Sequence, residues 1–479
     1  MATAPKVTTP SKHIPDLQVR DLPDAPRSMW RIIGPGVIGA GVGIASGEFI
    51  LWPYISAQVG LVFLWAALVG LFTQYFINME IERYTLATGE TALTGFNRFW
   101  RHWGLVFAIM VYFANLWPGW ATSSATMVTY LFGGNARWIG IIMMLVIGAS
   151  LTLAPVVYTV LERVEWAKIV LVLLLILGAL AFAISAQTWG ELGKATAAPE
   201  FPAEQLGFAL ILGALAFAGA GGGQNLCQSN WIRDKGLGMG AHIPRLVSPV
   251  TGKDDIAAPS LGYVFEPNQQ NMSRWRNWWR LANMEQLSTF VLITFLSILF
   301  MSMLAYSTVF GREGLPDDIG FLQIEGQQLS AEVAPWFGNL FWVVGALSLF
   351  AGAMGIVDYT SRLAADVLKT AYFRESSWSE SKIYFTLVWG LILLGCLILL
   401  LGVDQPLVLL VISSCVGGGM MVIYSALLIL LNKKKLPKPI RIGTGRTAAL
   451  VWAVLLFGVL AAVTIWQQGA ELIASFTGG

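Results

Sequence analysis

Charged residues are scarce in this sequence. Only 12% of its 479 residues are Asp, Glu, Lys or Arg, whereas 56% are hydrophobic. A soluble protein needs about a quarter of its residues charged to cover its surface with polar groups. The composition therefore excludes a soluble globular protein, and it predicts that lipid covers much of the surface.

Cysteine and histidine are also rare, with three of each in the chain. Cys227, Cys396 and Cys415 lie in apolar segments without CxxC spacing or neighbouring histidines, so a disulfide framework and a zinc site are both disfavoured. The sequence has no phosphate-binding loop or nucleophile triad, and it predicts neither an enzyme nor a cofactor. The net charge of +2 is spread over separate loops, so we expect no nucleic-acid partner.

Long apolar runs recur along the chain. About 20 consecutive apolar residues cross a bilayer, and runs near this length predict about 11 membrane spans. They lie at 32–57, 60–80, 104–132, 137–158, 167–187, 206–232, 285–309, 335–359, 383–403, 405–431 and 447–466. Residues 1–29 contain five prolines and no apolar core, which favours a flexible cytoplasmic tail over a cleaved signal peptide.

The distribution of basic residues predicts the orientation. If the N-terminus is cytoplasmic, it shares its side of the membrane with the loops 83–101, 162–168, 233–280, 362–382 and 433–446. The tail and these loops hold 27 of the 30 Lys and Arg residues, and only Arg137, Lys194 and Arg312 fall on the opposite side. The positive-inside rule therefore predicts a multi-pass protein of the cell membrane, with the N-terminus inside and the C-terminus outside.

Two of the predicted spans contain clusters of glycine with embedded polar residues. The first span carries Gly34-Pro35-Gly36, Gly39, Gly41, Gly43 and Ala45-Ser46-Gly47-Glu48, and the sixth carries Gly219 to Asn225. Irregular polar backbone at bilayer depth is tolerated only where protein or a water-filled cavity satisfies it. We therefore expect helices 1 and 6 to be broken, although these glycines can also serve close helix packing alone.

Broken helices five spans apart are typical of inverted repeats. The sequence predicts an all-α integral membrane protein with two inverted five-helix repeats, at 30–187 and 205–432, and an additional helix at 445–470. The second repeat includes an inner loop at 236–275 to which we assign no role. We predict a secondary transporter whose substrate site lies where the two helices break.

The sequence resembles the NRAMP family of divalent metal transporters. The resemblance runs from Gly34-Pro35-Gly36 through Gln58-Val59-Gly60, Leu64-Trp65 and Arg83 to Ala87-Thr88-Gly89, and continues more weakly through Leu161-Glu162-Arg163-Val164-Glu165, Asn225-Leu226 and Phe350-Ala351-Gly352-Ala353. It covers about 30–430. It implies the inverted-repeat fold that the family shares with many amino-acid transporters.

The family's metal-binding motif is absent from this chain. The family's first-helix Asp-Pro-Gly-Asn falls on Ala45-Ser46-Gly47-Glu48, and its sixth-helix Met-Pro-His-Asn-Leu falls on Gly222-Gly223-Gln224-Asn225-Leu226. The thioether that favours soft transition metals is thereby lost. The proton route implied by the family is altered as well, because Gln224 replaces its histidine and Trp117 and Trp120 stand where acids are expected.

Glu48 is the main candidate for a substrate or metal ligand, because an ionisable residue at mid-membrane depth is usually functional. Ala45 and Ser46 share its break. In the alternative, Ser46 caps the outer half-helix and Glu48 only faces its positive end.

Gly222, Gly223, Gln224 and Asn225 are the candidates on the sixth span. They offer backbone and side-chain groups to a substrate, or they make only interhelical hydrogen bonds. Asp358, Arg362 and Asp366 follow one another at intervals of four, which places them on one helix face as an inner gate or a structural ion-pair group.

The most favoured function is NRAMP-related transport of hydrated divalent cations such as Mg²⁺, without proton coupling. One carboxylate among neutral oxygens suits Mg²⁺, which gives up its water reluctantly. The alternatives are a transporter of a small organic solute such as an amino acid, and a non-transporting membrane sensor or scaffold. The expected partners are the substrate and the lipid bilayer, and the sequence gives no oligomeric state.

Overall fold

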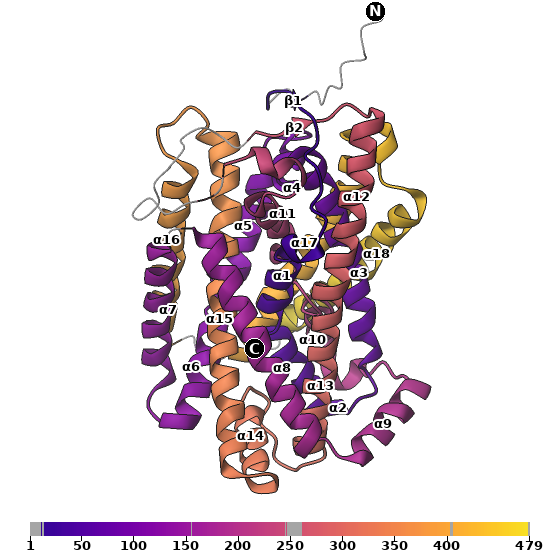
Figure 1. Ribbon diagram of the computed structural model, residues 1–479. Helices are drawn as coiled ribbons and strands as arrows, with labels where there is room; N and C mark the ends of the chain where they lie inside the picture. The colour runs from indigo at the N-terminus through magenta and orange to yellow at the C-terminus, as the bar shows by residue number, and fades with distance from the viewer. Residues whose placement is uncertain are drawn as a thin grey trace, which may run out of the picture.

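The computed structural model describes residues 11, 14–154, 156–244, 246, 261–402 and 406–477, with side chains up to residue 468. Most of the helices run roughly parallel or antiparallel to one another (Figure 1). The short strands β1 (Gln18–Val19) and β2 (Tyr263–Val264) lie at one end of this bundle, which we call the strand end. Helix α14 (Phe321–Glu332) lies at the opposite end, which we call the α14 end.

The helices follow one another in two halves. The first half consists of η1 (Met29–Arg31), α1 (Pro35–Gly43), η2 (Ser46–Leu51), α2 (Trp52–Val59), α3 (Trp65–Thr88), α4 (Ala92–Asn97), α5 (Trp103–Asn115), α6 (Gly119–Phe132), α7 (Ala136–Leu153), α8 (Val157–Phe182) and α9 (Ala186–Ala197). The second half consists of α10 (Ala203–Ala216), α11 (Gly223–Lys235), η3 (Gly238–His242), α12 (Gln269–Gln286), η4 (Leu287–Val291), α13 (Leu292–Val309), α14, α15 (Pro335–Val367), η5 (Leu368–Tyr372), α16 (Glu380–Leu400), α17 (Pro406–Lys434), η6 (Lys438–Ile440) and α18 (Thr444–Thr477).

The helices agree with the predicted all-α membrane fold. Within the described residues, nine helical segments are long and apolar enough to cross a membrane. Helix α3 has 24 residues but carries polar side chains, and α10 is a shorter apolar helix that continues, after a break, into α11. With α3 and the α10–α11 pair, the structure contains the eleven spans expected from the sequence.

The first and sixth spans are broken, as the glycine clusters predict. Helix α1 ends at Gly43, and the π-helical segment η2 restarts the span at Ser46. In the sixth span α10 ends at Ala216 and α11 begins at Gly223. Between them Gly219, Gly221 and Gly222 have the positive φ angles that glycine favours.

The two breaks pack directly against each other. A β-carbon built at Gly43 would overlap the carbonyl oxygen of Gly219, and one at Gly47 would overlap the carbonyl oxygen of Phe217. Glycine at these positions therefore lets the backbones of the two broken spans touch, which places carbonyl groups of one break beside the other.

The third span is also broken, which the sequence analysis did not anticipate. Helix α5 ends at Asn115 and α6 begins at Gly119, with Leu116, Trp117 and Pro118 between them. Proline lacks an amide hydrogen and disfavours a helical conformation in the residue before it, so Pro118 accounts for the interruption.

The segment 162–168, expected as a loop, lies inside helix α8, which begins at Val157. Its charged residues suggested a connection between spans. In the structure Glu165 and Lys168 are buried and form an ion pair of 2.6 Å, so their charges are compensated within the bundle.

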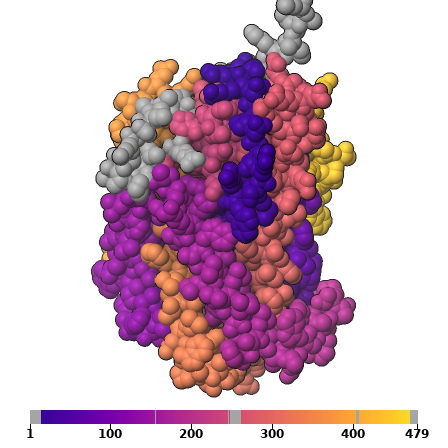
Figure 2. Space-filling view, viewed as in Figure 1, coloured from indigo at the N-terminus to yellow at the C-terminus, as the bar shows by residue number. Residues whose placement is uncertain are grey.

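The described part of the expected flexible tail, residues 14–29, packs on the strand end. Strand β1 pairs in parallel with β2, and Leu22 is fully buried. Asp24 forms an ion pair of 2.6 Å with Arg274 of α12. Figure 2 shows this indigo segment lying along the surface beside the salmon-coloured residues of α12. These pairings fix the segment, whereas its prolines and mixed charges had suggested a free tail.

We predict that Gly47→Ala destabilises the protein, because the new methyl group meets the backbone oxygen of Phe217, which has little freedom to move. Overpacking of this kind costs about 1–3 kcal/mol. The control is Gly419→Ala, since a β-carbon at Gly419 in α17 meets no atom within 4 Å. Thermal unfolding of both variants in detergent checks the prediction, and equal melting temperatures would contradict the close contact between the breaks.

Candidate functional site

Glu48 lies at the break of the first span, in the first turn of η2. Its side chain is fully buried, and within the described residues neither carboxylate oxygen has a hydrogen-bond partner. Its Oε1 atom is 3.0 Å from the position that a β-carbon on Gly43 would take, so the carboxylate turns back toward the break. The Thr294 hydroxyl of α13 is a polar group close to this carboxylate, and the Lys168 ammonium of α8 attracts it electrostatically.

The contacts at η2 do not include a side-chain cap. Ala45 occupies the N-cap position, where no side-chain hydrogen bond is made, and Ser46 is already inside the helical segment. The methyl group of Ala45 packs against Gly352 of α15, where a β-carbon would overlap it. A capping hydrogen bond therefore does not account for Glu48, although its charge also faces the positive end of η2.

Gln74 of α3 holds the break of the sixth span. Its side-chain amide donates to the carbonyl oxygens of Leu215, Ala216 and Ala218, at 3.1, 2.9 and 3.1 Å. Its side-chain oxygen accepts a hydrogen bond of 2.8 Å from the amide of Ala220. One side chain thus satisfies most of the backbone groups that the break frees in the middle of the membrane.

Asn225 also forms hydrogen bonds that hold the break of the sixth span. Its oxygen accepts from the amide of Gly222 at 3.0 Å and from the Tyr424 hydroxyl at 3.2 Å, and its amide donates to Asn78 at 2.7 Å. These bonds fix the first turn of α11. Asn225 therefore positions the break, and its side chain is already occupied by protein partners.

The other candidates on the sixth span also contact neighbouring helices. Gln224 donates a hydrogen bond to the carbonyl oxygen of Gly39 and thereby ties α11 to α1. Gly222 lies against the backbone of Gly417 in α17, and Gly223 lies against Val111 of α5. The structure thus brings the two breaks together, and at their contact the Gln224 and Asn225 side chains bond protein groups, whereas the Glu48 carboxylate has no hydrogen-bond partner in the described residues.

Several residues of this region were not singled out from the sequence. Gln74, Asn78 and Glu82 follow one another at intervals of four on α3, and all three face α11, where Gln228 donates to Glu82 at 3.4 Å. Polar residues at this spacing in an apolar helix were the available signal. Thr294 and Lys168 carried no comparable pattern.

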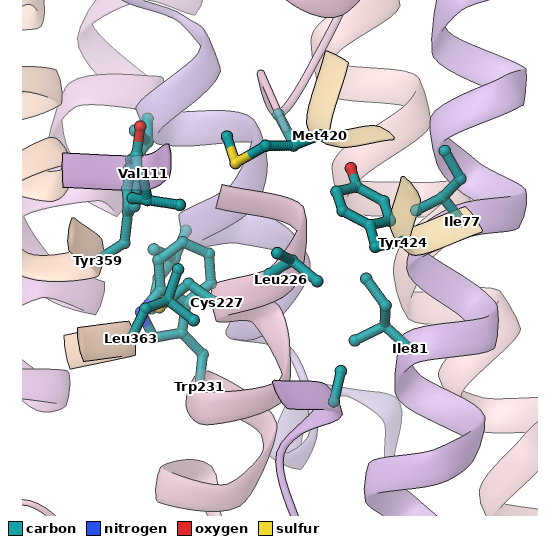
Figure 3. Close-up of a cluster of buried hydrophobic side chains, with 14 of the residues drawn as sticks. Ile77, Ile81, Val111, Leu226, Cys227, Trp231, Tyr359, Leu363, Met420 and Tyr424 are labelled. Carbon is teal, nitrogen blue, oxygen red and sulfur yellow. The ribbon is translucent and has the colours of Figure 1, made fainter. Parts of the chain in front are cut away.

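Apolar side chains fill the bundle between the breaks and the strand end. Figure 3 shows side chains of α11 packed between those of α3, α15 and α17. The labelled residues are Ile77, Ile81, Val111, Leu226, Cys227, Trp231, Tyr359, Leu363, Met420 and Tyr424. Packed apolar side chains therefore separate the two breaks from the strand end.

A buried ion-pair network adds to this separation. Arg362 pairs with Asp358 at 2.8 Å and also with Asp234 of α11. Asp366 does not pair with Arg362, since it lies 2.7 Å from Arg233, which in turn lies 2.7 Å from Glu380 of α16. The two carboxylates expected on one helix face with Arg362 thus pair with different arginines, and the network joins α11, α15 and α16.

Trp117 and Trp120 lie at the break of the third span. Trp120 is buried and donates to the carbonyl oxygen of Asn115 at 3.1 Å, whereas the Trp117 indole nitrogen has no partner within the described residues. Asn115 also bonds Thr360 and Tyr359 of α15, at 2.9 and 3.2 Å. No carboxylate, histidine or lysine is part of these contacts.

The chain matches no family model and no curated protein sequence. Its fold matches a manganese transporter mutant of Eremococcus coleocola with a TM-score of 0.66 and 14% identity, over 99% of this chain and 92% of that chain. A second mutant of that transporter gives 0.67 and 14%, over 96% and 91%. Mhp1, a nucleobase-cation-symport-1 family transporter, gives 0.53 and 12%, over 93% and 95%.

Similarity at these identities defines the fold. The protein is an all-α integral membrane protein with the inverted-repeat fold of secondary transporters, broken in its first and sixth spans.

We predict that Gln74→Leu lowers the melting temperature strongly. The substitution keeps the size of the side chain but leaves three backbone groups of the break without a partner: the carbonyls of Leu215 and Ala218 and the amide of Ala220. The Ala216 carbonyl keeps its hydrogen bond from the Gly221 amide. Each buried unsatisfied group costs about 1–3 kcal/mol. Gln187→Leu on α9 is the control, because that side chain is exposed. A Gln74→Leu protein as stable as the control would refute the role given to Gln74.

Proposed function

We propose that this protein is an NRAMP-related secondary transporter that carries hydrated divalent cations such as Mg²⁺ without proton coupling. The observation that carries the proposal is that the Glu48 carboxylate is buried without a hydrogen-bond partner in the described residues. A buried carboxylate costs several kcal/mol unless it is paired or hydrogen-bonded, and this one has no hydrogen-bond partner within the described residues. A cation bound between the two breaks supplies the missing interaction.

The surroundings of Glu48 favour a cation that keeps part of its water. The carbonyl of Gly219 lies beside Gly43, and the Thr294 hydroxyl adds a neutral oxygen. No group of three or more His, Cys, Asp or Glu residues suited to a metal occurs in the described chain. One carboxylate among neutral oxygens is a typical environment for Mg²⁺, which usually retains several waters.

The proposal of transport without proton coupling depends on the residues at the positions where the NRAMP resemblance implies a proton route. Gln224, Trp117 and Trp120 carry no proton near neutral pH, and their side chains bond backbone carbonyls or lie without an ionisable partner. The strand end, which holds the segment 14–29, is in this proposal the cytoplasmic end. The network around Arg233 and Arg362 is then the inner gate, closed in this conformation.

We predict that Glu48→Gln lowers the affinity for Mg²⁺ by at least about tenfold, because interactions with a charged group contribute about 1.5–3 kcal/mol. Folding should not be weakened, since the interaction of Glu48 with the helix end contributes only about 0.3–1 kcal/mol and the neutral side chain removes the cost of burying a charge. Isothermal titration and thermal unfolding of the same purified variant measure both quantities.

The matched control is Glu325→Gln. Glu325 of α14 is another fully buried glutamate without a hydrogen-bond partner in the described residues, but it lies away from the breaks. It should leave Mg²⁺ affinity unchanged. Unchanged affinity in Glu48→Gln would remove Glu48 from the site, and binding of amino acids or betaines in place of Mg²⁺ would favour an organic substrate.

We further predict that Mn²⁺ and Cd²⁺ bind no more tightly than Mg²⁺. Cd²⁺ gains from sulfur ligands, and Mn²⁺ would lack the paired Asp and Asn of the NRAMP motif, since neither these residues nor a sulfur remains at the break. Competition of each ion against Mg²⁺ in the titration tests this selectivity. Micromolar Mn²⁺ affinity that disappears in Glu48→Gln would overturn the choice of ion while leaving the site in place.

A further inference from the structure

Helix α1 is held by charged side chains at both of its ends. At its N-terminus the Glu285 carboxylate accepts hydrogen bonds from the amides of Gly34 and Gly36, at 3.2 and 2.9 Å. At its C-terminal end the Lys168 ammonium donates to the carbonyl oxygen of Gly41. This matches the helix dipole, which favours an anion at the first end and a cation at the second.

Lys168 is an unusual residue for this position. Its side chain is 2% exposed, well inside α8, where an ammonium group is costly without compensation. The compensation comes from Glu165, which is fully buried at 2.6 Å, and from the carbonyl end of α1. The proposed function uses neither residue.

The groups around the ammonium form the oxygen environment of a small cation. The Gly41 carbonyl is among the last in α1, where the helix supplies no amide partner. The Oε1 atom of Glu165 has no hydrogen-bond partner in the described residues, and it lies 3.4 Å from the place of a β-carbon on Gly355 of α15. The ammonium therefore sits where α1, α8 and α15 meet, beside the break and near Glu48.

We infer that Lys168 fills a monovalent-cation site with the chain's own ammonium group, and that the Glu165 carboxylate and the Gly41 carbonyl bind a free cation such as Na⁺ when this group is removed. An ammonium is a compact, strongly hydrated charge of one unit. A single carboxylate with carbonyl oxygens is a hard oxygen site of matching charge. The intact protein accordingly needs no inorganic cation at the end of α1.

This inference goes beyond the proposed function and stands apart from it. Binding of Mg²⁺ depends on Glu48, whereas the cation site depends on Glu165 and is measured with Na⁺ in the absence of Mg²⁺. A failure to find Na⁺ binding would therefore leave the proposal of Mg²⁺ binding at Glu48 unaffected, and the reverse also holds.

The experiment compares purified wild type with Lys168→Ala in NaCl and in N-methylglucamine chloride at equal ionic strength. Lys168→Ala should show saturable ²²Na⁺ binding near one ion per chain and a melting temperature that rises with Na⁺ concentration, because a ligand that binds only the native state stabilises it. Wild type should show neither effect. The double variant Lys168→Ala/Glu165→Ala should lose both.

Lys194→Ala is the matched surface control. Lys194 forms an ion pair with Glu191 at the same three-residue spacing and a similar distance, 2.7 Å, but its side chain is 75% exposed. Water already solvates that carboxylate, so this variant should not bind Na⁺.

Two results would overturn the inference. One is a folded Lys168→Ala protein without Na⁺ binding, or with the same Na⁺ response as wild type. The other concerns the case in which Lys168→Ala does not fold in any monovalent salt. The double variant Glu165→Gln/Lys168→Met, which has no charge at either position, then shows whether the fold survives without the ion pair. If this double variant folds and Na⁺ still does not rescue Lys168→Ala, the groups do not form a cation site. Rescue of folding by Na⁺ over N-methylglucamine supports the inference.

Discussion

The structure depends on the requirement that backbone polar groups inside a bilayer find partners within the protein. Breaking two spans at mid-membrane depth frees amides and carbonyls that water cannot reach. Gln74 bonds four of those groups at the sixth-span break, and Asn225 bonds a fifth. At the first-span break Gln224 and Lys168 bond carbonyls of α1. Side chains from α3, α8 and α11 therefore make the broken helices possible, and they restrict how the breaks can move.

The same contacts connect the breaks to the strand end. Helix α11 begins at the break, where Asn225 bonds Asn78 of α3, and ends at Arg233 and Asp234, which pair with α15 and α16. An opening at the strand end has to separate these buried charges. Removing one partner of a buried pair costs several kcal/mol, so the separated arginines and carboxylates need water or new partners as the helices part.

The sequence was sufficient for the features that depend on local composition. The apolar runs predicted the all-α membrane fold, and the glycine clusters predicted the two breaks. It was insufficient where a charge is compensated by a distant residue. Glu165 and Lys168 suggested a loop, because the carbonyl of Gly41 that helps to stabilise Lys168 is far away in the chain. For the same reason the pairing of Asp366 with Arg233 on α11 could not be derived from the spacing within α15.

Glu48 differs from the buried charges around it. Glu165 has Lys168, Asp358 and Asp234 share Arg362, and Glu285 accepts two backbone amides, so each is stabilised by the fold itself. Within the described residues the Glu48 carboxylate has no such bond, although it lies where two breaks meet. A fully compensated carboxylate would gain little from a substrate. An uncompensated one gains much, because binding then removes a cost that folding left in place. Glu325 lacks a partner as well but lies away from the breaks, so it is the missing bond together with the place between the two breaks that makes Glu48 the candidate binding residue.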